Sequence, residues 1–149
     1  MADPSGVLNV LLEALHNATH GYTVAADNAA GPELVAFFNV AETTRRELAD
    51  EVAAEVKRLG GEPARFGTAG GVLSRAWMDV KGVLGGRDDL AMLESCEAGE
   101  ADTERAYEEA LAEALPPDTR ALLEGHLSAV RDSHARVREL RDRFRAGRS

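Results

Sequence analysis

The sequence contains little cysteine, few aromatic residues and no long apolar run. Cys96 is the one cysteine among 149 residues, so the chain can form neither an internal disulfide nor a zinc site made of cysteines. No apolar run approaches the roughly 18 residues that a membrane-spanning helix requires. The first residues also lack the basic start and the apolar stretch of a secretory signal. We therefore expect a cytoplasmic protein without a membrane segment.

Positive charge is scarce as well, because 26 acidic residues oppose 17 lysines and arginines and the formal net charge is -9. An acidic chain is repelled by phosphate backbones, which argues against general binding to nucleic acid. Aromatic residues make up 5% of the chain, so a core has to be built mainly from Leu, Val and Ala. The length and the 44% hydrophobic content suit one globular domain.

Apolar residues recur at helical spacing in four long segments, and no segment shows the alternation of a strand. Helices are predicted at residues 6–28, 33–59, 88–114 and 118–144, within one domain at 6–147 that follows a disordered tail at 1–5. Glycine and proline separate the segments, as is usual at helix ends. The expected fold class is all-α.

The connection between the second and third helices is long, at residues 60–87. The other two connections are short, and short loops make neighbouring helices antiparallel. A long connection can travel the length of a bundle, so the second and third helices can run parallel. This is the single-crossover arrangement of a ferritin-like four-helix bundle. Within the crossover, Val72–Leu84 is amphipathic and predicts a short helix in which Trp77 packs against the bundle.

Charged residues interrupt the apolar faces of the long helices near mid-length. At about 100° per residue, glutamates share the core face of the third helix with Leu93 and Tyr107. A histidine likewise lies between Val130 and Val137 in the fourth helix. The predicted buried polar network consists of Glu42, Arg45, Glu97, Glu100, Glu104, His134 and Arg141.

Counting residues from the helix ends places much of this network at one level. Arg45 and Glu100 each lie about twelve residues after the start of their helices. If these helices run parallel, the common rise per residue places the two residues at the same level along the bundle. His134 follows the Pro116-Pro117 turn by about as many residues as Glu97–Glu100 precedes it. Unpaired buried charges are costly, so these groups must pair, bind metal or open to water.

Two interpretations remain open for the network. Ferritin-like di-iron sites use Glu from two helices and Glu-x-x-His from the other two. However, Arg45 follows Glu42 where this motif has His, and Arg131 precedes His134 where it has Glu. A guanidinium carries a permanent charge and can fill the space of a metal, which favours a metal-free network. The candidate ligands for iron or manganese in the other interpretation are Glu42, Glu97, Glu100 and His134.

His16 is an outside candidate for a metal ligand. Glu13 and His16 have Glu-x-x-His spacing, but Glu13 points about 150° away from the centre of the apolar face. Cys96 neighbours an apolar face and is expected to be a small core residue. The last stretch, 131–149, holds seven arginines against three acidic residues, and we expect it to contact the acidic helices of the chain. No phosphate loop and no nucleophile–histidine–acid set stands out, which argues against an enzyme.

Several stretches of the sequence are familiar in combination: Arg58–Pro63, Ser74–Lys81, Glu97–Glu100, Tyr107–Leu111 and His134–Asp142. Together they resemble a widespread bacterial family of ferritin-like four-helix-bundle proteins of unknown function, and the resemblance covers Leu8 to Phe144. It implies the bundle fold and a retained inner network that includes Arg45, Glu100 and His134. It implies no activity, because none is established for the family.

The sequence therefore predicts a non-catalytic structural or stress-associated bundle without a cofactor. It identifies no specific protein partner and is compatible with a homodimer. The alternative is a di-iron or di-manganese protein of the ferritin-like class that carries out redox chemistry or handles iron.

Overall fold

The computed structural model describes residues 3–65 and 88–147, and this part of the chain consists of four long helices without a strand. The helices are α1 (Pro4–Asn28), α2 (Pro32–Arg58), α4 (Asp89–Leu111) and α5 (Pro117–Gly147). Each predicted boundary lies within three residues of the observed one, so the all-α prediction is confirmed. Among the described helices, none is both long and apolar enough to cross a membrane.

Proline and glycine fix several helix ends. Helix α1 begins at Pro4, so Pro4 and Ser5 belong to the helix and not to the predicted tail. Proline suits a first helical position because its missing N–H would have no partner there. Helix α2 is followed by Gly60, whose φ of 89° lies in the left-handed region that favours glycine.

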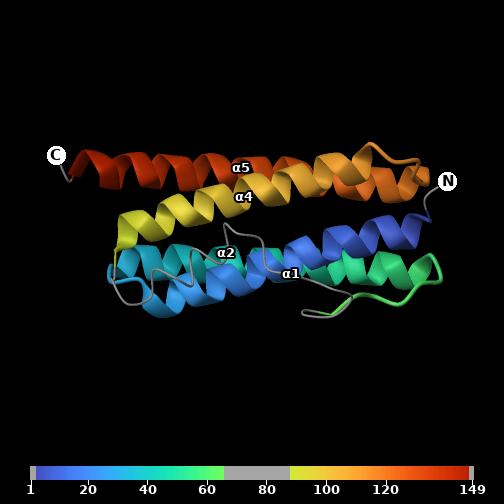
Figure 1. Cartoon of the computed structure of the whole chain (residues 1–149), viewed down its shortest axis with the longest axis horizontal. Coiled ribbons are helices and arrows are strands. Elements are labelled where there is room, and N and C mark those ends of the chain that lie inside the picture. Colours follow the sequence, from blue (N-terminus) through green and yellow to red (C-terminus); the bar gives the residue numbers. More distant parts are fainter. Residues whose placement is uncertain (1–2, 66–87, 148–149) are drawn as a thin grey trace.

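The helices form two antiparallel pairs, α1 with α2 and α4 with α5, and α2 runs in the same direction as α4 (Figure 1). The side chain of Asp89 accepts hydrogen bonds from the backbone N–H groups of Ala30 and Gly31, at 2.9 and 3.1 Å. The start of α4 is therefore tied to the start of α2. Since α2 ends at the opposite end of the bundle, the order of the helices has the form of a ferritin-like bundle. The helix predicted at 72–84, with Trp77, lies outside the described residues.

The apolar core consists of two clusters, one toward each end of the bundle. The first includes Tyr22, Phe38, Ala41, Met92, Leu93, Cys96, Val137 and Leu140. The second includes Leu8, Leu11, Leu12, Leu15, Leu48, Val52, Tyr107, Leu123 and Val130. On α2 and α4, Arg45 and Glu100 lie between the residues of the first cluster and those of the second. A layer of buried charge thus divides the core at mid-length.

The contact between the end of α2 and the start of α1 predicts opposite effects for two glycine substitutions. A Cβ added at Gly61 would lie 2.7 Å from Cβ of Ser5, whereas one added at Gly125, inside α5, would have no neighbour within 4 Å. Gly61→Ala should lower the free energy of unfolding by about 1–3 kcal/mol, the range for overpacking. Gly125→Ala should raise it by about 0.5–1 kcal/mol, because alanine favours a helix. Urea unfolding measures both, and equal effects would contradict the described contact.

Candidate functional site

Arg45 and Glu100 form a buried ion pair across the middle of the bundle. Nη2 of Arg45, on α2, donates a hydrogen bond of 3.0 Å to Oε1 of Glu100, on α4. Arg45 is 1% exposed and Glu100 is 0% exposed. Burial by itself would lower the pKa of Arg45, but the charge of Glu100 and its hydrogen bond raise this pKa above the ordinary value. The guanidinium therefore keeps its charge inside the core.

Two further donors converge on the same oxygen of Glu100. The hydroxyl of Tyr22, on α1, donates to Oε1 of Glu100, and the hydroxyl of Ser133, on α5, lies 3.4 Å from it. Burial, followed by the charge of Glu100, raises the pKa of Tyr22 well above its usual range, so the phenol is a donor. We did not predict Tyr22 as a member of the network. The available signal was the rule that a buried tyrosine hydroxyl needs a partner.

A second group of predicted residues lies between α4 and α5, partly open to solvent. Nδ1 of His134 lies 3.0 Å from Oε1 of Glu104, and its Nε2 lies 3.6 Å from Oε1 of Glu97. Arg141 donates to the same oxygen of Glu97 through Nη1 at 3.0 Å. His134 thus lies between two carboxylates. These side chains therefore lie in two parts, a buried pair and this half-buried group.

Glu42 is buried, but its carboxylate does not join Arg45 or Glu100. It accepts a hydrogen bond from Arg46, one turn further along α2. The physical reason is its place at the edge of the apolar face, from which the nearby exposed guanidinium of Arg46 is within reach. Sequence spacing placed Glu42 at the right depth but could not determine its partner.

The candidate metal ligands are dispersed. Among the residues that the structure describes, no three His, Cys, Asp or Glu side chains gather in a way that could hold a metal ion. Glu100 is engaged by Arg45, and Glu42 by Arg46. His16 lies apart from these residues, where its Nε2–H donates to the carbonyl oxygen of Ala64 at 3.1 Å. The donors present suit hydrogen bonding to each other better than the ligand set of a di-iron site.

A further row of hydrogen-bonded side chains, which we did not predict, links the core to the surface. The hydroxyl of Tyr107, on α4, lies 3.0 Å from Nδ1 of His126, on α5. Nε2 of His126 lies 3.2 Å from Oε1 of Glu51, on α2. His126 is buried, and the Glu51 side chain is 55% exposed. In the sequence, the position of His126 at the border of an apolar face was the sign that its ring could take part in such hydrogen bonds.

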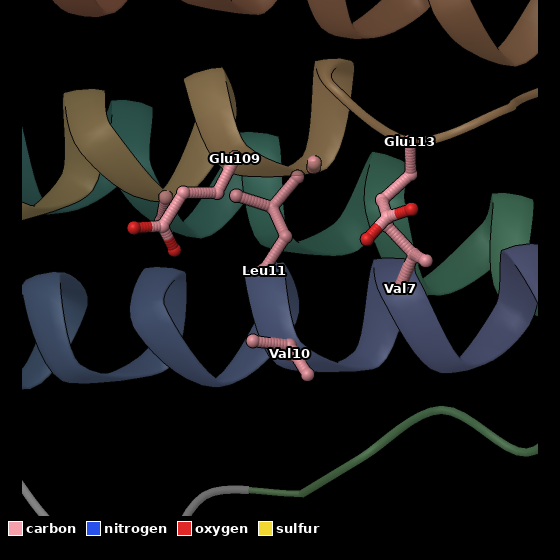
Figure 2. A pocket seen from close by; sticks show the side chains of 7 residues that line it. Val7, Val10, Leu11, Glu109 and Glu113 are labelled. Atoms are coloured by element: carbon pink, nitrogen blue, oxygen red, sulfur yellow. The ribbon is translucent and has the colours of Figure 1, made fainter. Parts of the chain in front are cut away.

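Two open hollows on the surface lie away from the buried pair. One, of about 180 Å³, lies between α1 and α4, where Glu109 and Glu113 flank Val7 and Leu11 (Figure 2). The other, of about 370 Å³, is lined by His16 and by residues at and after the end of α2. Neither is lined by Arg45 or Glu100. The buried network is thus built into the core and does not line either hollow.

Two simpler predictions are confirmed. Cys96 is fully buried, and burial, with the charge of Glu100, raises the pKa of its thiol well above the usual range. Three arginines of the basic end of α5 pair with acidic residues of α4 and α2. These pairs are Arg131–Glu108, Arg145–Glu94 and Arg143–Glu33, at 2.9, 2.7 and 3.5 Å. Much of the positive charge at this end is therefore paired within the chain.

Comparison with known proteins agrees with this geometry. Two solved structures of Dps from Mycobacterium smegmatis are similar in fold. A Dps1 point mutant has a TM-score of 0.74 at 18% identity, covering 92% of this chain and 93% of that one. A C-terminal deletion mutant of Dps has a TM-score of 0.75 at 23% identity, covering 92% and 95%.

These likenesses establish the ferritin-like four-helix bundle. No curated protein sequence matches this chain. A family model matches residues 3–113, which is more than half of the chain. The protein therefore belongs to the family described as Domain of unknown function (DUF2383), a family of ferritin-like four-helix bundles.

Proposed function

We propose that this protein is a non-catalytic structural bundle in which a buried ion network fixes the register of the helices. One observation carries the proposal. Oε1 of Glu100, on α4, lies within hydrogen-bond distance of one donor from each of the other three described helices, Tyr22, Arg45 and Ser133. Sliding any of these helices by one turn, about 5.4 Å, would remove its donor.

The network is better suited to specificity than to stability. A buried ion pair costs desolvation that its attraction only partly recovers, and apolar residues of similar size are often at least as stable. Here Nε of Arg45 and Oε2 of Glu100 have no hydrogen-bond partner within the described structure, which adds to the cost. Helices faced with Leu, Val and Ala can pack in several registers, and one buried polar contact selects among them.

The permanent charge of Arg45 also supports a metal-free centre. A guanidinium neutralises the carboxylate of Glu100 directly, from the position where a ferritin-like site would place a cation. Cytoplasmic location, a stress-associated role and a homodimer remain predictions from the sequence, and the proposal does not depend on them.

The half-buried group favours a second candidate function, the binding of iron or manganese. His134 lies between Glu97 and Glu104, and imidazole and carboxylate are ligand types that these metals accept. The three side chains do not gather as a metal-holding group in the described structure, so binding would require them to move together. For binding, Arg141 would have to release Glu97, to which it donates at 3.0 Å. The ferritin-like fold is compatible with such a role.

Removing the central cation tests the structural proposal. Arg45→Ala should lower the free energy of unfolding by about 3–5 kcal/mol, because it leaves the carboxylate of Glu100 buried without its partner. Adding Glu100→Gln should recover part of this loss, since the uncompensated charge is then gone. Urea unfolding in the presence of a chelator measures both single variants and the pair.

Arg46→Ala is the matched control for this cycle. Arg46 is the next residue on α2 and pairs with Glu42, but its side chain is 61% exposed. Its loss should cost about 1 kcal/mol or less, as for exposed ion pairs. Additive effects of Arg45→Ala and Glu100→Gln, or equal costs for the two arginine variants, would contradict a coupled buried pair.

Elemental analysis separates the two candidate functions. If Arg45, and not a metal ion, neutralises Glu100, protein purified without chelators should contain iron and manganese only in traces. About two metal atoms per chain, with iron-dependent consumption of oxygen, would instead support the second candidate. His134→Ala should then remove the metal, whereas it would leave the trace content unchanged under the structural proposal.

A further inference from the structure

The hydrogen bonds that link Tyr107, His126 and Glu51 are not explained by the structural proposal. They join α4, α5 and α2 at the level of the second apolar cluster, apart from the hydrogen bonds around Glu100. The two rings meet edge to face, with centroids 5.8 Å apart and planes at 79°. Tyr107 is 0% exposed, so these hydrogen bonds connect a buried phenol to a carboxylate at the surface.

For a neutral imidazole, the acceptor at the surface end fixes the direction of both hydrogen bonds. Because the ionised carboxylate of Glu51 can only accept, Nε2 of His126 carries the proton that it donates to Glu51. In the neutral imidazole, Nδ1 is then an acceptor and receives the hydroxyl proton of Tyr107. The phenol is therefore hydrogen-bonded to a base that is itself oriented by a carboxylate.

Burial determines what Tyr107 can do with its proton. Burial raises the pKa of its hydroxyl far above the usual range, and the nearby charge of Arg45 opposes this only in part. Simple ionisation to a phenolate is therefore excluded near neutral pH. An electron can leave the phenol ring if the hydroxyl proton leaves with it, because the proton then moves to a base that is already in contact.

We infer that Tyr107 is a one-electron donor, oxidised by a diffusible one-electron oxidant as its hydroxyl proton passes to His126. The O–H bond of Tyr107 breaks, an N–H bond forms at Nδ1, and the oxidant takes the electron. The products are a neutral tyrosyl radical, an imidazolium and the reduced oxidant. Glu51 stabilises the imidazolium and, being half exposed, can pass the proton from Nε2 to water.

Tyr22 provides an internal comparison, because it is also buried and hydrogen-bonded to an acceptor. Its acceptor, Oε1 of Glu100, already receives a hydrogen bond from the permanently charged Arg45. Taking up the proton of Tyr22 would cost Glu100 its buried ion pair with Arg45. Glu100 is also fully buried, whereas Glu51 is open to solvent. Oxidation should therefore select Tyr107 over Tyr22.

The composition of the chain makes this selection measurable. The sequence has two tyrosines and one tryptophan, so Trp77→Phe removes the indole that would compete as an electron donor. In this background, photogenerated ruthenium(III) tris-bipyridine serves as the one-electron oxidant. Electron paramagnetic resonance and transient absorbance should show a tyrosyl radical that is lost in Tyr107→Phe and retained in Tyr22→Phe. Loss of the signal in Tyr22→Phe with retention in Tyr107→Phe would overturn the inference.

A second variant tests the proton step without disturbing the core. Glu51→Gln changes an exposed position of α2, and Glu47→Gln, one turn earlier and also exposed, is its matched control. Glu51→Gln should slow radical formation and change its hydrogen–deuterium isotope effect, whereas Glu47→Gln should leave both as in the parent. Equal rates and isotope effects in the two variants would overturn the role of the His126–Glu51 pair. This inference goes beyond the structural proposal, and urea unfolding of the Arg45 variants tests that proposal separately.

Discussion

The four described helices meet at one oxygen atom, Oε1 of Glu100. Donors from α1, α2 and α5 converge on it inside a core that is otherwise mainly apolar. Hydrophobic burial drives the helices together but is not directional, so it leaves their register open. The hydrogen bonds to Glu100 have defined lengths and angles. Under the proposed function, the apolar clusters provide most of the stability, and the charged layer between them provides the register.

The same layer explains why the described residues of this ferritin-like bundle do not form the ligand pattern of a di-iron protein. A di-iron centre holds several carboxylates together through metal charge. Here Arg45 neutralises Glu100, Arg46 pairs with Glu42, and Arg141 pairs with Glu97. Each of these three carboxylates therefore has an arginine beside it. Charge is balanced locally by the chain itself, which agrees with a bundle that is built for packing.

Much of the fold could be predicted, because helical periodicity, Pro32, Pro117 and Gly60 mark the elements and their ends. The depth of Arg45 and Glu100 followed from counting residues along parallel helices. Partners were harder to predict, since they depend on how far each side chain reaches across an interface. The contact of Tyr22 with Glu100 joins residues 78 positions apart, and no local pattern marks it. The pairing of His126 with Glu51 was missed for the same reason.

The central claim is that the guanidinium of Arg45, and not a metal ion, neutralises Glu100 in the middle of the bundle. Anomalous diffraction from crystals soaked in iron(II) or manganese(II) tests it most directly. The account predicts that Nη2 of Arg45 stays within hydrogen-bond distance of Oε1 of Glu100, 3.0 Å here, with no anomalous peak at that carboxylate. An anomalous peak bonded to Glu100, with Arg45 displaced from it, would contradict the account.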